Sequence, residues 1–293
     1  MNRLPASLTF AILCGVSLVV WFRPLLHTFA LALSDDRYTH VLLILPVTAA
    51  MILQDWRGRS HESPLWTPAV GLLAISLLLG GWARWGNLGG GSDVRLAIEM
   101  AGLVLWWLGS FVFCFGLQSL RSFHFPLFFL FWMIPIPRFV LDQIVAELQR
   151  GSAVAAQFLF SILGVPVSRD GTILLIPGLN IEVAAECSSI RSSLMLLVTT
   201  MVLAHVILRS PWRKALVIAS VVPLSVLKNG LRIFTIGMLS TRVDRSFLTG
   251  RLHHNGGIVF FLIALSVIFL LLWILRRGER VVTSTPELNP ARP

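Results

Sequence analysis

The chain has 293 residues, of which 56% are hydrophobic and only 13% charged, and its mean hydropathy is +0.80. A soluble domain of this length carries about twice that fraction of charged residues, so these values exclude a soluble globular protein and predict a polytopic membrane protein. The net charge of +10 does not indicate nucleic-acid binding. The basic residues stand singly or in pairs at the ends of apolar runs, where such residues set the orientation of membrane proteins.

Eight apolar segments approach or exceed the length that crosses a bilayer, about 17 to 25 residues. The expected spans are Leu8–Phe22, His40–Gln54, Thr67–Trp82, Leu96–Phe115, Phe123–Ile136, Ile190–Leu208, Lys214–Leu239 and Gly256–Leu275. A cleaved signal peptide is the alternative for the first segment, but it is long and lacks a small-x-small cleavage site, so we expect a retained span. We expect residues 1–283 to form a single membrane domain and residues 284–293 to form a disordered tail.

The one long non-spanning region lies between the fifth and sixth expected spans. Its first part, FVLDQIVAELQRGSAVAAQFLFSIL, mixes apolar and charged residues and predicts one or two amphipathic helices at the membrane interface. Its second part, TILLI-PG-LNIEVA, places two short β-type runs around a turn and predicts a β-hairpin directly before Cys187. The predicted fold is therefore an all-α membrane protein with about eight transmembrane helices, interfacial helices and a short hairpin.

Basic clusters give the expected orientation. The densest are residues 209–214, 276–280 and 56–59, together with Arg3, and with eight spans all four fall on one side of the membrane. That side is expected to be the cytoplasm, which makes the protein a multi-pass membrane protein with both ends of the chain inside. The hairpin and residues 241–254 would then lie on the extracytoplasmic side.

Cys187 is the one cysteine with polar neighbours, in the stretch AECSSIR, whereas Cys14 and Cys114 lie inside apolar runs. A helix that begins near Cys187 would favour the nucleophilic thiolate through its dipole, as would the guanidinium of Arg191 on the same face. The carboxylate of Glu186 beside Cys187 would instead disfavour the thiolate. The alternative is an ordinary helix start at which serines such as Ser188 cap the helix and Arg191 reaches the interface. No CxxC or His/Cys spacing indicates a metal site, and we expect no cofactor.

Two further polar groups are unusual in a membrane protein. KNGLRIF places Lys228, Asn229 and Arg232 inside the seventh expected span, where such residues need a polar cavity or a partner. LHHNGG places His253 and His254 at the start of the eighth, and the alternative for these is a pair of loop histidines. The sixth span starts, the seventh ends and the eighth starts on the same side. A thiol, a cation and an imidazole can therefore converge there, as cysteine-based acyl transfer requires.

These motifs resemble those of the exosortase/archaeosortase family. AECSSIR is similar to the family's E-x-C-S-G-[IL]-R, residues 229–233 match N-G-x-R-I, and His253 stands four residues before Gly257 with aromatics beyond. FPLFFLFWMIPIP and YTHVLLILP are similar to two other family segments. The chain departs from the pattern at Ser189, where the family has glycine. Either His253 or His254 could correspond to the family's histidine, and the spacing to Gly257 favours His253.

The resemblance implies a cysteine protease or transpeptidase that processes membrane-tethered proteins carrying a C-terminal signal, one span and a basic tail, as in PEP-CTERM proteins. It assigns Cys187 as the nucleophile, Arg232 as the orienting or oxyanion-stabilising cation and His253 as the acid/base. Arg191, Asn229 and Lys228 become supporting residues, with Ser188, His254 and Glu186 beside the site. The other hypotheses are a membrane acyltransferase that uses the same cysteine, and a non-catalytic component or transporter of exopolysaccharide export. The lack of internal symmetry and of paired broken spans counts against a transporter.

Overall fold

The computed structural model describes residues 5–56, 66–86, 91–183, 190–244 and 251–282, and within these it describes only the backbone of residues 66–67, 251–256 and 280–282. The expected disordered tail at 284–293 lies outside the described residues. The chain divides into two compact units, Met1–Leu141 and Asp142–Pro293.

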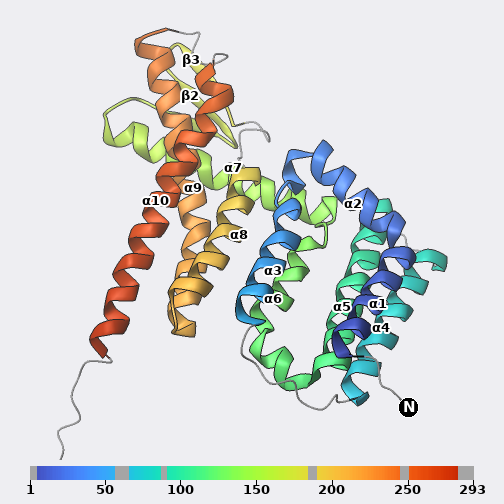
Figure 1. The fold of residues 1–293 in the computed structure, drawn as a ribbon. Helices are drawn as coiled ribbons and strands as arrows, with labels where there is room; N and C mark the ends of the chain where they lie inside the picture. The colour runs from blue at the N-terminus through green and yellow to red at the C-terminus, as the bar shows by residue number, and fades with distance from the viewer. Residues whose placement is uncertain (1–4, 57–65, 87–90, 184–189, 245–250, 283–293) are drawn as a thin grey trace, which may run out of the picture. The chain divides into compact units, whose positions relative to one another are not determined.

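The first unit is helical throughout its described part (Figure 1). Its elements are α1 (Ala6–Val20), α2 (Phe22–Ser34), η1 (Asp36–Tyr38), α3 (Val41–Trp56), α4 (Trp66–Trp85), α5 (Gly91–Ser122), α6 (His124–Phe129) and η2 (Leu130–Met133). The helix pair α4 and α5 packs closely, because Ser76 Oγ donates a 2.6 Å hydrogen bond to the carbonyl of Gly102 and glycines line the contact.

Proline explains the bend of 75° between α1 and α2. Pro24 lies in the first turn of α2, where its ring would clash with the carbonyl of Val20 in a continuous helix, and it has no N–H to offer that carbonyl. The guanidinium of Arg84 donates a hydrogen bond to the Val20 carbonyl instead. The first expected span, Leu8–Phe22, is therefore the first half of a bent helix pair.

Two side chains hold the proline-rich segment between η2 and α7 (Arg138–Ile162). The hydroxyl of Tyr38 donates a 2.8 Å hydrogen bond to the carbonyl of Ile136, and the carboxylate of Asp93 accepts one of 2.9 Å from the backbone N–H of Arg138. Pro135 and Pro137 cannot continue a helix here. The expected fifth span, Phe123–Ile136, is therefore a short helical segment, His124–Met133, that ends at these prolines.

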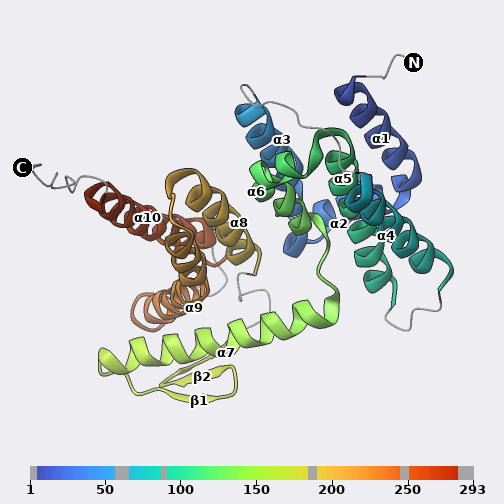
Figure 2. The same cartoon turned by 90° about the horizontal axis from the view of Figure 1, so that it is seen from below.

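The second unit combines α7, a small sheet and a three-helix bundle (Figures 1 and 2). Its further elements are β1 (Ser168–Asp170), β2 (Ile173–Ile176), β3 (Leu179–Glu182), α8 (Ile190–Ile207), α9 (Pro211–Arg242) and α10 (Arg251–Val282). The amphipathic region predicted as one or two helices is one continuous helix, α7.

The predicted hairpin is confirmed, and a third strand extends it. The antiparallel order is β1-β2-β3, and Ile176 pairs with Leu179 across the turn Pro177-Gly178. Gly178 has φ 81°, as a type II turn requires after proline. Leu174 and Ile176 are buried on one face of the sheet, against Ala153, Ala156 and Phe160 of α7, and Figure 2 shows the strands running along that helix.

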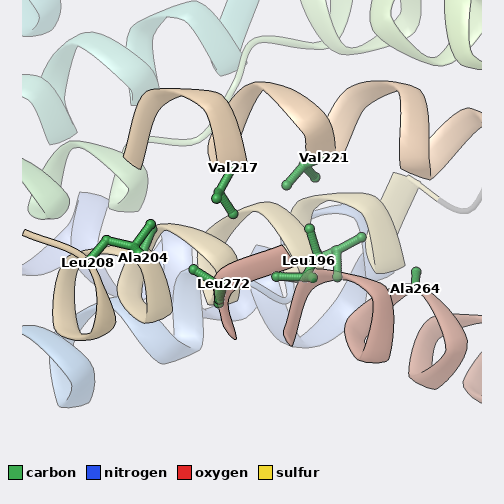
Figure 3. Close-up of a cluster of buried hydrophobic side chains, with 8 residues drawn as sticks. Leu196, Ala204, Leu208, Val217, Val221, Ala264 and Leu272 are labelled. Carbon is green, nitrogen blue, oxygen red and sulfur yellow. The ribbon is translucent and has the colours of Figure 1, made fainter. Parts of the chain in front are cut away.

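Apolar residues form the core of the α8–α10 bundle (Figure 3). The buried cluster consists of Leu196, Ala204, Leu208, Val217, Val221, Ala264, Ile268 and Leu272. At one end of the bundle the Glu279 carboxylate accepts hydrogen bonds from the backbone N–H groups of Arg209 and Ser210. Arg213 donates to the carbonyl of Leu275 at the same end. The start of α8, the end of α9 and the start of α10 therefore share the opposite end.

The structure confirms an all-α polytopic fold. Six of the described helical segments are long and apolar enough to cross a membrane, and the number rises to eight if each of two bent helix pairs counts as one span. The six are Asp36–Trp56, Pro68–Trp85, Gly91–Ser122, Ile190–Ile207, Pro211–Arg242 and Gly257–Glu279.

Candidate active site

The polar segment of α9 is held by two other helices of the second unit. Lys228 is only 5% exposed, and its ammonium donates a hydrogen bond to the hydroxyl of Ser192 in the first turn of α8. Asn229 is 1% exposed, and its amide donates a 3.0 Å hydrogen bond to the hydroxyl of Ser152 in α7, itself fully buried. Adjacent residues thus join α9 to α8 and to α7. The expectation that these polar groups have partners is met by two serines.

Glycine permits the close approach of α9 to α7. A Cβ on Gly230 would lie 2.6 Å from the Cβ of Ala155 and 3.1 Å from the backbone nitrogen of Ala156. Two turns later, a Cβ on Gly237 would lie 2.6 Å from Ile181 of β3 and 2.8 Å from the ring of Phe160. At Gly230 and Gly237 the backbone of α9 therefore comes close to α7 and the sheet, which fixes the depth of Asn229.

Arg232 follows Lys228 by one helical turn, so the two residues lie on the same side of α9. The Arg232 side chain is partly buried, while the next residue, Ile233, packs into the apolar cluster of α7 and the sheet. Phe234 meets the ring of Phe160 edge to face, with the ring centroids 4.9 Å apart. These contacts fix the rotation of α9 about its axis, and with it the direction of Lys228 and Arg232.

The stretch that contains Cys187 is attached at both ends to this assembly. On one side, Val183 is 1% exposed and its carbonyl accepts a 2.8 Å hydrogen bond from the side-chain amide of Gln149 in α7. On the other, Ile190 is buried at the start of α8, two residues before Ser192. Glu186, Cys187 and Ser188 themselves lie outside the described residues, as does Ser189. Arg191 is exposed in the first turn of α8.

The two candidate histidines belong to the first turn of α10, which begins at Arg251. Their side chains lie outside the description, so the choice between His253 and His254 stays a prediction. The start of α10 shares the end of the bundle at which α8 begins and α9 ends. Chain direction therefore brings the elements that carry Cys187, Arg232 and His253 to one end, as expected from the alternation of spans.

Three residues of this region have no sequence motif of their own: Gln149, Ser152 and Ser192. Serine and glutamine are common on helices. No periodic pattern in the sequence tells whether such a residue forms a hydrogen bond with a buried group of another element or is exposed. The only available signal for Ser152 is the run of small residues Gly151–Ala153, which permits close helix packing. Among the described side chains, no group of three His, Cys, Asp or Glu residues could hold a metal ion.

Comparison with known proteins identifies the family. A model of the transmembrane exosortases (Exosortase_EpsH) matches residues 32–270, which include all of the motif residues above. Searches of curated proteins and of solved structures return no match. Because the matched residues make up most of the chain and the polytopic helical fold agrees, the chain belongs to the transmembrane exosortase family.

Proposed function

We propose that the protein is a membrane-embedded cysteine peptidase or transpeptidase that cleaves C-terminal sorting signals of membrane-tethered proteins. One observation carries the proposal. The Lys228–Arg232 segment is hydrogen-bonded to α7 and α8 beside the two attached ends of the segment that contains Cys187. Three peptide units separate Cys187 from Ile190, so covalent geometry keeps their Cα atoms within about 11 Å.

The proposed reaction begins with attack of the Cys187 thiolate on the carbonyl carbon of the scissile peptide bond. Arg232 stabilises the negative oxygen of the tetrahedral intermediate. As the C–N bond breaks, His253 in its protonated form gives its proton to the departing amine, and a thioester forms at Cys187. Water, or an amine or hydroxyl acceptor, then attacks the thioester while the histidine takes up its proton. The thiolate is thereby restored.

The proposed substrates carry a short C-terminal signal, one span and a basic tail, as the family resemblance implies. At a site on the extracytoplasmic side of a bacterial inner membrane, the short signal would lie next to the reactive groups, while the basic tail stays on the cytoplasmic side. A tethered substrate diffuses in the plane of the bilayer, so an enzyme whose reactive groups lie at the end of a helical bundle meets the peptide just outside the span. Arg232 lies in the C-terminal half of α9, toward the end of the bundle at which α8 begins, and in the proposed orientation that end faces the signal.

The test measures processing of a co-expressed tethered substrate by variants of the full-length protein. Cys187→Ala should reduce cleavage by about 10⁴-fold or more, as loss of a nucleophile does. Arg232→Ala should reduce it by about 10²- to 10³-fold through loss of oxyanion stabilisation. Cys114→Ala, which removes a buried thiol in α5, is the matched control and should cleave normally.

Protein level in the membrane is measured for each variant, so that loss of cleavage is separated from loss of protein. Normal cleavage by Cys187→Ala at a normal level would falsify the nucleophile assignment and favour a non-catalytic membrane component. Separate His253→Ala and His254→Ala variants show which of the two histidines acts as the acid/base. The proposal expects the larger loss at His253.

A further inference from the structure

One turn of α7 carries two polar side chains, Gln149 and Ser152, and each forms a hydrogen bond with a different element. The two residues are three positions apart, so they share a face of the helix. The side-chain amide of Gln149 donates a 2.8 Å hydrogen bond to the carbonyl of Val183, which directly follows β3. The hydroxyl of Ser152 accepts a 3.0 Å hydrogen bond from the side-chain amide of Asn229 in α9. This turn of α7 therefore holds both the end of the sheet and the polar segment of α9.

The bond from Gln149 fixes the chain shortly before Cys187. Val183 is 1% exposed, and its N–H donates a 3.1 Å hydrogen bond to the carbonyl of Thr172, so both polar groups of its backbone have partners. Four peptide units join Val183 to Cys187, which keeps their Cα atoms within about 14 Å of each other. The position of Val183 therefore limits where the thiol can lie.

The bond to Ser152 fixes the depth and rotation of α9 close to Arg232. Asn229 is 1% exposed and Ser152 is fully buried, so the bond is shielded from water. Arg232 follows Asn229 by three residues, which places it about 4.5 Å further along the axis of a rigid helix. A shift of Asn229 therefore moves Arg232 by a similar amount.

We propose that Gln149 and Ser152 are positioning residues of the proposed reaction, which together set the separation of the Cys187 thiol from the Arg232 guanidinium. The inference rests on the proposed function, and it gives the two residues a role in the chemical step that they exert through their hydrogen-bond partners. Loss of either bond leaves a buried carbonyl or amide to find another partner, which favours a shift of its segment. A misplacement of about 1 Å can cost about 10²-fold in rate.

The test measures kcat and KM of the full-length protein, reconstituted in vesicles of phosphatidylcholine, on a tethered reporter substrate. Gln149→Met removes the donor with little change of volume, and Ser152→Ala removes the acceptor. Each should lower kcat by about tenfold or more and change KM by less than about twofold, because the bonds align reacting groups and do not bind the substrate. The value of kcat is expressed per mole of monodisperse protein, which separates loss of activity from loss of folded protein. If Gln149→Met does not accumulate, Gln149→Glu is the second variant, since ionised glutamate has the same shape and no N–H donor.

Two residues of the same helix provide matched controls. Gln157→Met makes the first change two turns further along α7, where the side-chain oxygen accepts a 3.1 Å hydrogen bond from Arg169 of β1. Ser161→Ala makes the second change at an exposed residue, whose hydroxyl donates to the carbonyl of Gln157 in its own helix. Both variants should keep the wild-type kcat.

A double-mutant cycle separates positioning from a purely structural role. Ser152 acts on the reaction through Arg232, so Ser152→Ala should lower kcat by less than about twofold when Arg232→Ala is already present. Hydrogen exchange followed by mass spectrometry gives a measurement that does not depend on cleavage. Gln149→Met should exchange faster than wild type in a peptide that spans residues 179–189, with unchanged exchange in α10.

Three results would overturn the assignment. The first is a wild-type kcat in Gln149→Met and Ser152→Ala, with or without a change of KM. The second is an effect of Ser152→Ala that is equally large with and without Arg232→Ala, which indicates a structural role. The third is unchanged exchange of residues 179–189 in Gln149→Met. Normal cleavage by Cys187→Ala would instead refute the proposed function, whereas unchanged exchange together with an inactive Cys187→Ala would refute only the positioning role.

Discussion

Gly230 directly follows Lys228 and Asn229, the two polar residues that fasten α9, and its missing side chain is as important as their hydrogen bonds. A Cβ there would meet Ala155 at 2.6 Å, well inside van der Waals contact. Motif comparison marks Asn229 and Gly230 together, but only the structure separates their roles. Asn229 supplies the bond to Ser152, and Gly230 supplies the space that lets the bond form.

Gly230→Ala should therefore destabilise the protein by about 1–3 kcal/mol, as overpacking of a tight contact does. The measurement is denaturation in detergent micelles followed by tryptophan fluorescence. Ala155→Gly removes the opposing methyl group but not the backbone contacts at 3.1 and 3.2 Å, so the double variant should be more stable than the sum of the two single effects predicts, without regaining wild-type stability. Gly15→Ala is the control, since nothing lies within 4 Å of its added methyl, and it should be neutral or slightly stabilising. An equal cost at both glycines would contradict the packing argument.

At the scale of single residues, the sequence predicted which polar groups stand out but not what they contact. Lys228, Asn229 and Arg232 are conspicuous because charged and amide groups inside an apolar run are costly. Their partners Ser152 and Ser192 are inconspicuous, because a hydroxyl on a helix can also bond to its own backbone. Whether two side chains of different helices form a hydrogen bond depends on how closely the helices pack and how each is rotated about its axis. No local sequence pattern gives either quantity.

Among the elements, the β2–β3 hairpin could be predicted from its local sequence alone. A two-residue turn with proline first excludes the mirror-image turns usual in hairpins, because proline cannot take positive φ. Types I and II both accept proline first, and glycine in second place favours type II, which needs positive φ there; the observed φ of Gly178 is 81°. Strand β1 escaped prediction because its three residues, Ser168–Asp170, are polar and exposed.

Gly178→Ala should destabilise the hairpin by about 1–2 kcal/mol, because an L side chain at this φ is strained. Gly178→Asn should cost less, since asparagine tolerates the left-handed region. Hydrogen exchange followed by mass spectrometry should show faster exchange in residues 173–182 for the alanine variant and little change in the α8–α10 bundle. Unchanged exchange in the hairpin would mean that its contacts with α7, not the turn, set its stability.

Helix boundaries were less predictable than helix existence. The run Phe123–Ile136 has the length and hydropathy of a span, yet it forms a short α6 and the 3-10 turn η2 and stops at prolines. Tyr38 and Asp93 form hydrogen bonds with the backbone of Ile136 and Arg138, the residues beside those prolines. The mean hydropathy of a segment reflects its free energy of transfer to lipid. The end of a helix depends instead on proline and on hydrogen bonds to residues that are distant in the sequence.

For the molecule as a whole, orientation is the open prediction. Glu279 and Arg213 tie together the end of the α8–α10 bundle that carries the clusters 209–214 and 276–280. That end is expected to be cytoplasmic. The opposite end, where α8 starts, would then face the outside.

A thiol reagent that cannot cross membranes should therefore modify Cys187 when applied to the outside of intact spheroplasts. Cys14 is half-buried in α1 and Cys114 is buried in α5, so neither should react. Mass spectrometry of the labelled peptides identifies the modified residue, and inside-out vesicles provide the converse experiment. Modification of Cys187 only in the inside-out vesicles would reverse the orientation.

The length of α9 has a consequence for the lipid that surrounds the protein. From Arg213 to Lys228 the helix rises about 22 Å, and to Arg232 about 28 Å. A hydrocarbon layer is about 30 Å thick. If Arg213 and Trp212 mark one boundary of that layer, the two cations lie just beneath the other, at a depth set by bilayer thickness. Lengthening the acyl chains of reconstituted vesicles from 18 to 22 carbons should therefore submerge the pair and slow processing. The proposed activity would then be high in membranes of one thickness and low in thicker ones, with no change in the protein's own sequence.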